Sequence, residues 1–231
     1  MNRIFFTSDH HFGHDNILRY CEETRAFASI EEMDLDYAVR WNEVVGPGDI
    51  VWYLGDFSMK MAVVEIWLPQ LNGRKHLVIG NHDINGKELT AQRQERFLAA
   101  GFASVADSAV LEVEGVRFAL CHYPYRVPPK YLSADPRIAS REQAYAPRSL
   151  VSGQQAEAAL LHGHIHQNWR AKKQPARLPE LNVGVDAWSG VPVSGETLAA
   201  TFREVRAKGE DGMLTIYGEW LPAGRLRPDI G

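Results

Sequence analysis

Aspartate, asparagine and histidine side chains recur in this sequence directly after short apolar runs. In "FFTSDHHFGHDNI" (residues 5–17) Asp9 and His11 stand two positions apart, and "HGHIH" (162–166) repeats the spacing with His164 and His166. Oxygen ligands mixed with imidazole nitrogens suit Mn, Fe, Co, Ni or Zn better than Ca or Mg alone. Seven ligands exceed the needs of one tetrahedral ion and suffice for two ions that share a carboxylate. The candidate metal ligands are Asp9, His11, Asp56, Asn81, His122, His164 and His166.

Strand geometry predicts different roles for neighbouring histidines. Successive side chains of a strand point to opposite faces, so Asp9 and His11 would share one face. His10 would then point the other way, into a structural role. By the same alternation His164 and His166 would face a common point.

Parallel β-strands are the elements that would bring these residues together. The runs "RIFFTSD", "IVWYLGD", "HLVIGNHD", "FALCH" and "AALLHGHIH" each predict a buried strand that ends in Asp, Asn or His. Ser29 and Glu32 form a capping-box pattern that predicts a helix over 29–45. Further helices are predicted over 60–71, 87–100 and 194–209. Ligands of α/β sheets bind beyond the carboxyl ends of the strands, so the sequence predicts an α/β fold with one site at that edge.

Five short blocks in a fixed order resemble the calcineurin-like metallophosphoesterase family. They are Asp-x-His at 9–11, Gly-Asp at 55–56, Gly-Asn-His-Asp at 80–83, a histidine at 122 and Gly-His-x-His at 163–166. Each block alone is common, whereas five together and in order are specific. The resemblance implies a four-layer α/β/β/α sandwich with a di-metal site at the carboxyl ends of the strands.

The resemblance also implies a role for each residue. His82 would face the substrate without binding metal, and Asp83 would orient its imidazole. Two cations about 3.5–4 Å apart lower the pKa of a bridging water to about 7, so a metal-bridging hydroxide would attack phosphorus. His82 would then donate a proton or hydrogen bond to the leaving oxygen. The implied ligands are Asp9, His11, Asp56 and His166 for one ion and Asp56, Asn81, His122 and His164 for the other, with Asp56 as the bridge.

Phosphoester hydrolysis is the function that this resemblance implies, with phosphodiesters, nucleotide diesters among them, as the expected substrates. Phosphomonoesterase and nucleotide pyrophosphatase activities use the same metal chemistry and stay open as alternatives. Protein phosphatases of the family carry Asp-Arg-Gly after Gly-Asp, whereas "GDFSMKM" at 55–61 has no such arginine. A non-catalytic binding scaffold would lack ligands, and none is missing from these blocks.

Four polar residues are candidates for substrate contact. His14 and Asn16 follow the first ligands in a loop, where the alternative is a turn with a helix cap. Arg25 would clamp a phosphate bidentately unless it forms a surface ion pair. Arg126 lies in 123–150, a segment rich in Pro and Tyr with five basic against two acidic residues. Long irregular segments of compact domains are often functional, so we predict a substrate lid at 123–150 rather than a plain surface loop.

Length and composition predict a single domain over 1–231. A hydrophobic content of 45% is enough for one core, and the net charge of −4 gives no general attraction for nucleic acid. Cys21 and Cys121 lie far apart without a CxxC pattern, which indicates reduced thiols. No apolar run is long enough for a signal peptide or a membrane span. We therefore expect a cytoplasmic enzyme whose partner is a small phosphoester rather than a membrane.

Overall fold

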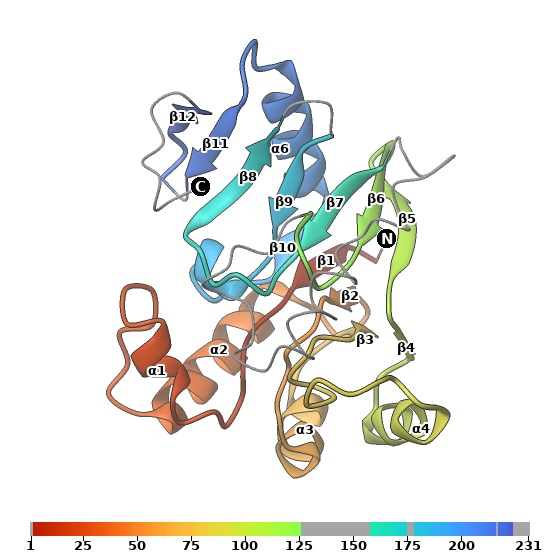
Figure 1. Ribbon diagram of the computed structural model, residues 1–231. Helices are drawn as coiled ribbons and strands as arrows, with labels where there is room; N and C mark the ends of the chain where they lie inside the picture. Colours follow the sequence, from red (N-terminus) through yellow and green to blue (C-terminus); the bar gives the residue numbers. More distant parts are fainter. Residues whose placement is uncertain (1, 126–157, 175–177, 216, 224–231) are drawn as a thin grey trace.

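Two β-sheets with helices packed against them form the fold in the computed structural model (Figure 1), which describes residues 2–125, 158–174, 178–215 and 217–223. The five-stranded sheet has the order β10-β1-β2-β3-β4. The seven-stranded sheet has the order β12-β11-β8-β9-β7-β6-β5. The predicted α/β class with two packed sheets is therefore confirmed.

The five-stranded sheet is parallel except at one edge. β1 pairs with β2, β2 with β3 and β3 with β4, all in parallel, and β10 lies antiparallel to β1. Parallel pairing places the carboxyl ends of β1, β2 and β3 along one edge of the sheet. The strands are β1 (Ile4–Thr7), β2 (Ile50–Tyr53), β3 (Arg74–Val78), β4 (Ser104–Ala106) and β10 (Val193–Ser194).

The seven-stranded sheet is mixed. β6, β7 and β9 are parallel neighbours, and the remaining pairings are antiparallel. β5 and β6 form a hairpin that turns at Glu114 and Gly115, whose φ angles of 52° and 70° suit a two-residue turn. The strands are β5 (Ala109–Val113), β6 (Val116–Leu120), β7 (Ala159–His162), β8 (Trp169–Lys173), β9 (Glu180–Asn182), β11 (Gly212–Thr215) and β12 (Trp220–Pro222).

The predicted helices form close to the expected residues. Ser29 accepts a hydrogen bond from the N–H of Glu32, whose carboxylate accepts one from the N–H of Ala28, so the capping pattern is confirmed. The side chains of Thr90 and Ser194 each accept a backbone N–H at the start of a further helix. The helices are α1 (Ile17–Tyr20), α2 (Ile30–Val44), α3 (Met61–Trp67), α4 (Ala91–Ala100) and α6 (Gly195–Ala207), with 3-10 turns η1 (Leu68–Gln70) and η4 (Val185–Ala187).

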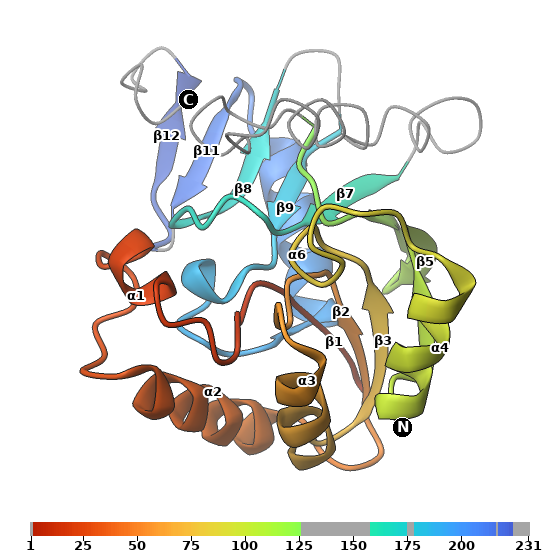
Figure 2. The ribbon, with the colours of Figure 1, turned by 60° about the horizontal axis from the view of Figure 1, so that its bottom comes forward.

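Two apolar clusters hold these layers together. One joins α2, α3 and α4 to the five-stranded sheet, and both views show these helices along the side of that sheet away from the other sheet (Figure 2). The second cluster joins the two sheets and α6, with Phe118 of β6 packed between Phe6 of β1 and Phe202 of α6. None of the described helices is long and apolar enough to cross a membrane.

Candidate metal centre

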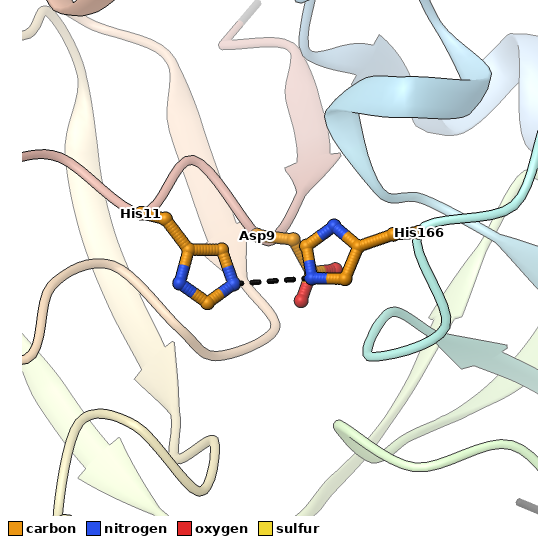
Figure 3. Close-up of side chains that lie close together, drawn as sticks. All are labelled: Asp9, His11 and His166. Carbon is orange, nitrogen blue, oxygen red and sulfur yellow. Dashed lines mark hydrogen bonds between the residues drawn. The ribbon is translucent and has the colours of Figure 1, made fainter. Parts of the chain in front are cut away.

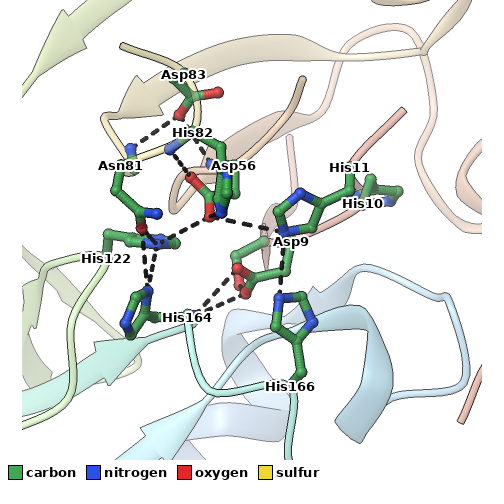
Figure 4. Close-up of polar contacts among 12 residues, drawn as sticks. Asp9, His10, His11, Asp56, Asn81, His82, Asp83, His122, His164 and His166 are labelled. Carbon is green, nitrogen blue, oxygen red and sulfur yellow. Dashed lines mark hydrogen bonds and ion pairs between the residues drawn. The ribbon is translucent and has the colours of Figure 1, made fainter. Parts of the chain in front are cut away.

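The carboxyl ends of strands from both sheets meet at one place. Beyond their ends, polar loops approach one another between the two sheets (Figure 4). A parallel bridge between Ser8 and Gly184 ties the sheets together at this edge. The loops carry Asp9 and His11 after β1, Asp56 after β2, Asn81 after β3, His122 after β6, and His164 and His166 after β7.

The backbone of these loops is left-handed rather than extended. The φ angles of Asp9, His11, Asp56, His164 and His166 are 63°, 54°, 61°, 73° and 46°. Strand alternation therefore does not position these side chains, and that part of the sequence argument is wrong. Each such residue costs about 1–3 kcal/mol of backbone strain and persists only where its surroundings fix it, as at functional sites.

Glycines make room for the two carboxylates. A Cβ atom on Gly163 would lie 2.1 Å from Oδ2 of Asp9, and one on Gly80 would lie 2.1 Å from Oδ1 of Asp56. Both distances are far inside van der Waals contact. The glycines of the predicted blocks therefore allow the backbone of one loop to pass directly against a carboxylate of another.

The first ligand group consists of Asp9, His11 and His166 (Figure 3). Nε2 of His11 lies 3.2 Å from Nε2 of His166 and 3.6 Å from Oδ2 of Asp56. Two imidazole nitrogens at this distance share at most one proton, so at least one lone pair faces the other ring.

The second ligand group consists of Asn81, His122 and His164. Oδ1 of Asn81 lies 3.1 Å from Nε2 of His122 and from Nδ1 of His164, and these two nitrogens are 3.2 Å apart. His122 donates its Nδ1–H to the carbonyl of Leu54 at 2.8 Å, which directs Nε2 into the group. Oδ2 of Asp56 lies 3.3 Å from that Nε2, so Asp56 reaches both groups.

These distances fit a pair of metal ions. Ligand atoms ~2.0–2.2 Å from a common ion lie roughly 3.0–3.5 Å from one another in tetrahedral or octahedral arrangements. The separations within the second group, and from Asp56 to each group, fall in or close to this range. The residues present therefore fit two cations that share Asp56.

Burial and charge prepare the site for cations. Burial holds the pKa values of His11 and His164 well below the usual range, so both rings are neutral and keep a lone pair for a ligand bond. Burial also raises the pKa of Asp56, but the imidazoles of His122 and His82 outweigh it and hold that pKa well below its usual value. Burial lowers the pKa of His122, whereas Asp56 and Asp9 raise it to about 9, so a metal ion that binds this ring must displace a proton.

His82 lies at the solvent side of the cluster, whereas Asp83 points away from it. The side chain of His82 is 37% exposed, and its Nε2 is 4.0 Å from Oδ2 of Asp56. The carboxylate of Asp83 accepts hydrogen bonds from the backbone N–H groups of Asp56, Phe57 and Gly80, each at 2.8 Å. The predicted role of Asp83 in orienting His82 is therefore wrong, because its oxygens instead hold the loop that carries Asp56.

The predicted substrate contacts have separate outcomes. The ring of His14 is half-buried, 5.5 Å from the ring of His11 and 6.0 Å from that of His82. Asn16 is exposed at the start of α1, where its side chain makes no cap bond. Arg126 and the lid predicted at 123–150 fall outside the described residues apart from 123–125, so their roles stay predictions.

Arg25 is not a phosphate clamp. Its side chain is fully buried, and its guanidinium bonds to the carboxylate of Asp186 and to the carbonyls of Asp9 and His10. The guanidinium therefore lies beneath the site, with no free face for a substrate. Asp186 stands 161 residues after Arg25 in the sequence, and no local sequence pattern connects the two residues.

His10 has the structural role that was expected. Its ring lies among four aromatic rings and stacks on Phe12 with centroids 5.1 Å apart. The hydroxyl of Tyr53 lies 2.9 Å from its Nδ1. Burial and the nearby Arg25 charge lower the pKa of His10 to about 3, so the ring is neutral.

Two further residues lie at the site without having been candidate site residues, although Tyr123 begins the lid predicted at 123–150. The hydroxyl of Ser8 donates to Oδ2 of Asp9 at 2.5 Å. The buried ring of Tyr123 lies 5.0 Å from that of His122 and 4.9 Å from that of His164. The available signal was adjacency, because each directly precedes or follows a candidate ligand.

Known proteins are similar to this chain over most of its length. The protein MJ1445 of Methanocaldococcus jannaschii, described as uncharacterized, is 34% identical over 200 residues, which cover 84% of this chain and 88% of that protein. The Gene 66 protein of Mycobacterium phage L5 is 30% identical over 203 residues, covering 81% of this chain and 88% of that protein. The crystal structure of AQ665 from Aquifex aeolicus, a protein of unknown function, shares the fold with a TM-score of 0.61 at 22% identity, covering 87% of this chain and 100% of that chain.

A family match covers most of the chain. Residues 3–187 match the family described as the calcineurin-like phosphoesterase superfamily domain, and all seven candidate ligands lie within that range. The chain belongs to the calcineurin-like phosphoesterase superfamily.

Proposed function

We propose that this protein binds two divalent transition-metal ions and hydrolyses phosphodiesters, nucleotide diesters among them. One observation carries the proposal. Oδ2 of Asp56 lies 3.6 Å from Nε2 of His11 in one ligand group and 3.3 Å from Nε2 of His122 in the other, so one carboxylate can serve two ions. The partly exposed imidazole of His82 has its Nε2 4.0 Å from the same oxygen.

The residues of the site would have two tasks: the metal ligands would bind the ions, and His82 would protonate the leaving group. Bound ions of this type supply an activated water at neutral pH and neutralise charge on the phosphoryl oxygens. Asp9, His11, Asp56 and His166 would hold one ion, and Asp56, Asn81, His122 and His164 the other. The transition metal, with Mn, Fe, Co, Ni and Zn as candidates, is left to experiment.

His82 is the residue best placed to protonate the leaving oxygen. Its backbone N–H donates to Oδ1 of Asp56 at 2.8 Å, which fixes the start of the side chain against the bridging carboxylate. Its ring is exposed enough to reach a substrate from the solvent side. His14 lies close to this ring and would contact the same part of the substrate.

The charge at the rim of the site, the solvent side where His14 and His82 lie, favours diesters over monoesters. A monoester is a dianion near neutral pH and gains from a cationic clamp, whereas a diester carries a single charge. Within the described residues, the imidazoles of His14 and His82 lie at this rim, and the guanidinium of Arg25 is buried away from it. Phosphomonoesters and nucleotide pyrophosphates are therefore the alternatives that the assay must test.

The test compares two substrates on metal-loaded protein. Protein stripped with a chelator and reloaded with Mn²⁺ is expected to cleave a bis-aryl phosphate faster than the matching aryl monophosphate. Faster monoester cleavage would reject the diester preference, and absence of both metal binding and hydrolysis with Mn²⁺, Co²⁺, Ni²⁺ and Zn²⁺ would reject the function as a whole.

A second comparison tests the role of His82 as the general acid. His82→Ala is expected to slow a diester with a poor leaving group by roughly 10²–10⁴-fold and to affect a nitrophenyl diester much less. His76→Ala is the matched control, because His76 lies within β3, where its ring stacks on Trp52 and contacts the hydroxyl of Ser104. Equal losses with both leaving groups would contradict the acid role.

A further inference from the structure

A buried ion pair lies directly behind the first ligand group. Nε and Nη2 of Arg25 bond to the two carboxylate oxygens of Asp186 at 2.9 and 2.7 Å, and neither side chain is exposed. The hydroxyl of Thr24 also donates to Asp186, at 2.6 Å. The pair is thus bidentate and fixed on more than one side, which is the geometry in which a guanidinium is most rigid.

The carboxylate of this pair fixes one candidate ligand. Oδ2 of Asp186 lies 2.9 Å from Nδ1 of His166, which must donate its proton there because a carboxylate only accepts. In the neutral form of the ring, Nε2 of His166 is then the nitrogen that carries the lone pair. It is also the nitrogen that faces the first ligand group, 3.2 Å from Nε2 of His11.

The guanidinium of the pair fixes a second ligand through its backbone. Nη2 of Arg25 donates to the carbonyl of Asp9 at 2.7 Å, and Nη1 donates to that of His10 at 3.1 Å. Asp9 has a φ of 63°, so its turn needs outside contacts to stay in place. One guanidinium therefore connects the turn after β1 with η4, which follows β9 of the other sheet.

We propose that Arg25 and Asp186 are positioning residues for the first metal subsite. Asp186 sets the tautomer and ring orientation of His166, and Arg25 holds both Asp186 and the turn that carries Asp9. The inference rests on the proposed function, since it assigns a role toward a metal ion. Partners of this kind behind a ligating histidine typically contribute 10–100-fold to metal affinity.

Energetics favour positioning over stability as the reason for this pair. Taking both charges out of water costs several kcal/mol per ion, and a buried pair often stabilises a fold no more than apolar residues of the same volume. The pair also adds no net charge next to the subsite. Removal of the Asp186 charge alone leaves a buried guanidinium close to His166, which disfavours a cation there.

Calorimetric titration with Mn²⁺ tests the proposal. Asp186→Asn removes the carboxylate. Arg25→Lys keeps the positive charge but cannot form the bidentate bond to Asp186. Asp49→Asn is the matched control, because Asp49 also pairs with an arginine, Arg3, but lies just before β2, at the opposite end of the strand from Asp56. Wild type and Asp49→Asn are expected to bind two equivalents, whereas Asp186→Asn and Arg25→Lys weaken one of the two sites by roughly 10–100-fold.

A second readout needs neither metal nor activity. Nitrogen-15 spectra of the metal-free protein are expected to show a proton on Nδ1 of His166 in wild type, and a mixture of Nδ1 and Nε2 tautomers in Asp186→Asn. Thr24→Val, which removes one bond to Asp186, replaces Asp186→Asn if that variant does not fold, and is expected to weaken one site several-fold.

The outcomes separate this inference from the proposed function. If wild type binds no Mn²⁺, the proposed function fails and the positioning role falls with it. If wild type binds two ions and all variants bind both with unchanged affinity, the positioning role alone is overturned. A His166 ring without a proton on Nδ1 in wild type would also overturn it.

Discussion

Asp83 provides the sharpest test of how this site is held. Its carboxylate accepts three backbone N–H groups, two on Oδ2 from Asp56 and Gly80 and one on Oδ1 from Phe57. An asparagine has only one acceptor oxygen. If that oxygen takes the place of Oδ2, the new amide group faces the N–H of Phe57, so Asp83→Asn loses one bond and brings two donors together.

The expected loss of stability follows from these contacts. A hydrogen bond to a charged group contributes about 1.5–3 kcal/mol, and the remaining two bonds weaken when the charge is removed. Burial and the nearby Asp56 charge raise the pKa of Asp83 to about 7, which shows that the charged form of Asp83 is disfavoured here. Removal of this charge in Asp83→Asn therefore offsets part of the lost stability. We expect a net loss of about 2 kcal/mol, which for a chain of this size lowers Tm by roughly 4–8 °C.

Thermal unfolding of metal-free protein at pH 8 measures this effect, with the exposed Asp15→Asn as the control. Asp83→Asn is expected to lower both Tm and metal affinity, because the loop that carries Asp56 is loosened. An unchanged Tm together with a selective loss of turnover would refute the reasoning and would return Asp83 to a role in orienting His82.

Three further predictions test separate parts of the structure. Gly163→Ala is expected to displace the carboxylate of Asp9 and to weaken Mn²⁺ binding by at least tenfold in calorimetry, since its new Cβ would overlap Oδ2; unchanged affinity would contradict the geometry. His10→Ala is expected to cost about 2–4 kcal/mol in denaturant unfolding while leaving metal stoichiometry at two, because it empties an aromatic pocket and removes the partner of the Tyr53 hydroxyl. Burial raises the pKa of Asp34 to about 7, so the folded state keeps a proton that the unfolded chain releases above about pH 4. Asp34 therefore contributes stability that is lost as pH rises from 4 to 7, so the difference in Tm between wild type and Asp34→Asn should change over this range; parallel curves would show that Asp34 does not contribute.

The candidate site was predictable because each ligand follows a strand. A short apolar run identifies a buried strand without knowledge of its neighbours, and parallel pairing sends the carboxyl ends of β1, β2 and β3 to one edge. Residue types after those runs then give the ligand chemistry. Local signals also located the helices, as the contact between Ser29 and Glu32 shows.

Contacts between distant loops were beyond the sequence argument. Arg25 stands in a polar stretch that is typical of a surface loop, and only the fold brings it to Asp186. Asp83 stands next to His82 in the sequence, yet its carboxylate accepts hydrogen bonds from the backbone N–H groups of Asp56 and Phe57 after β2. Adjacency in sequence predicted the wrong partner for Asp83, and the polar stretch around Arg25 predicted a substrate phosphate or a surface ion pair in place of a buried one, because polar side chains in loops bond to whichever loop packs against them.

Departures from local backbone rules nevertheless identify the site independently. Eight non-glycine residues of the described chain have positive φ, and five of them are candidate ligands. Elsewhere, Glu114 and Gly115 adopt such angles in a hairpin turn, where a two-residue connection requires them. No turn of this kind accounts for Asp9 or Asp56, whose angles instead direct carboxylates against Gly163 and Gly80 of other loops. This backbone strain is not required by a tight turn, and it is concentrated where the two sheets meet. It indicates that the fold accepts a cost in stability to hold these side chains in one arrangement.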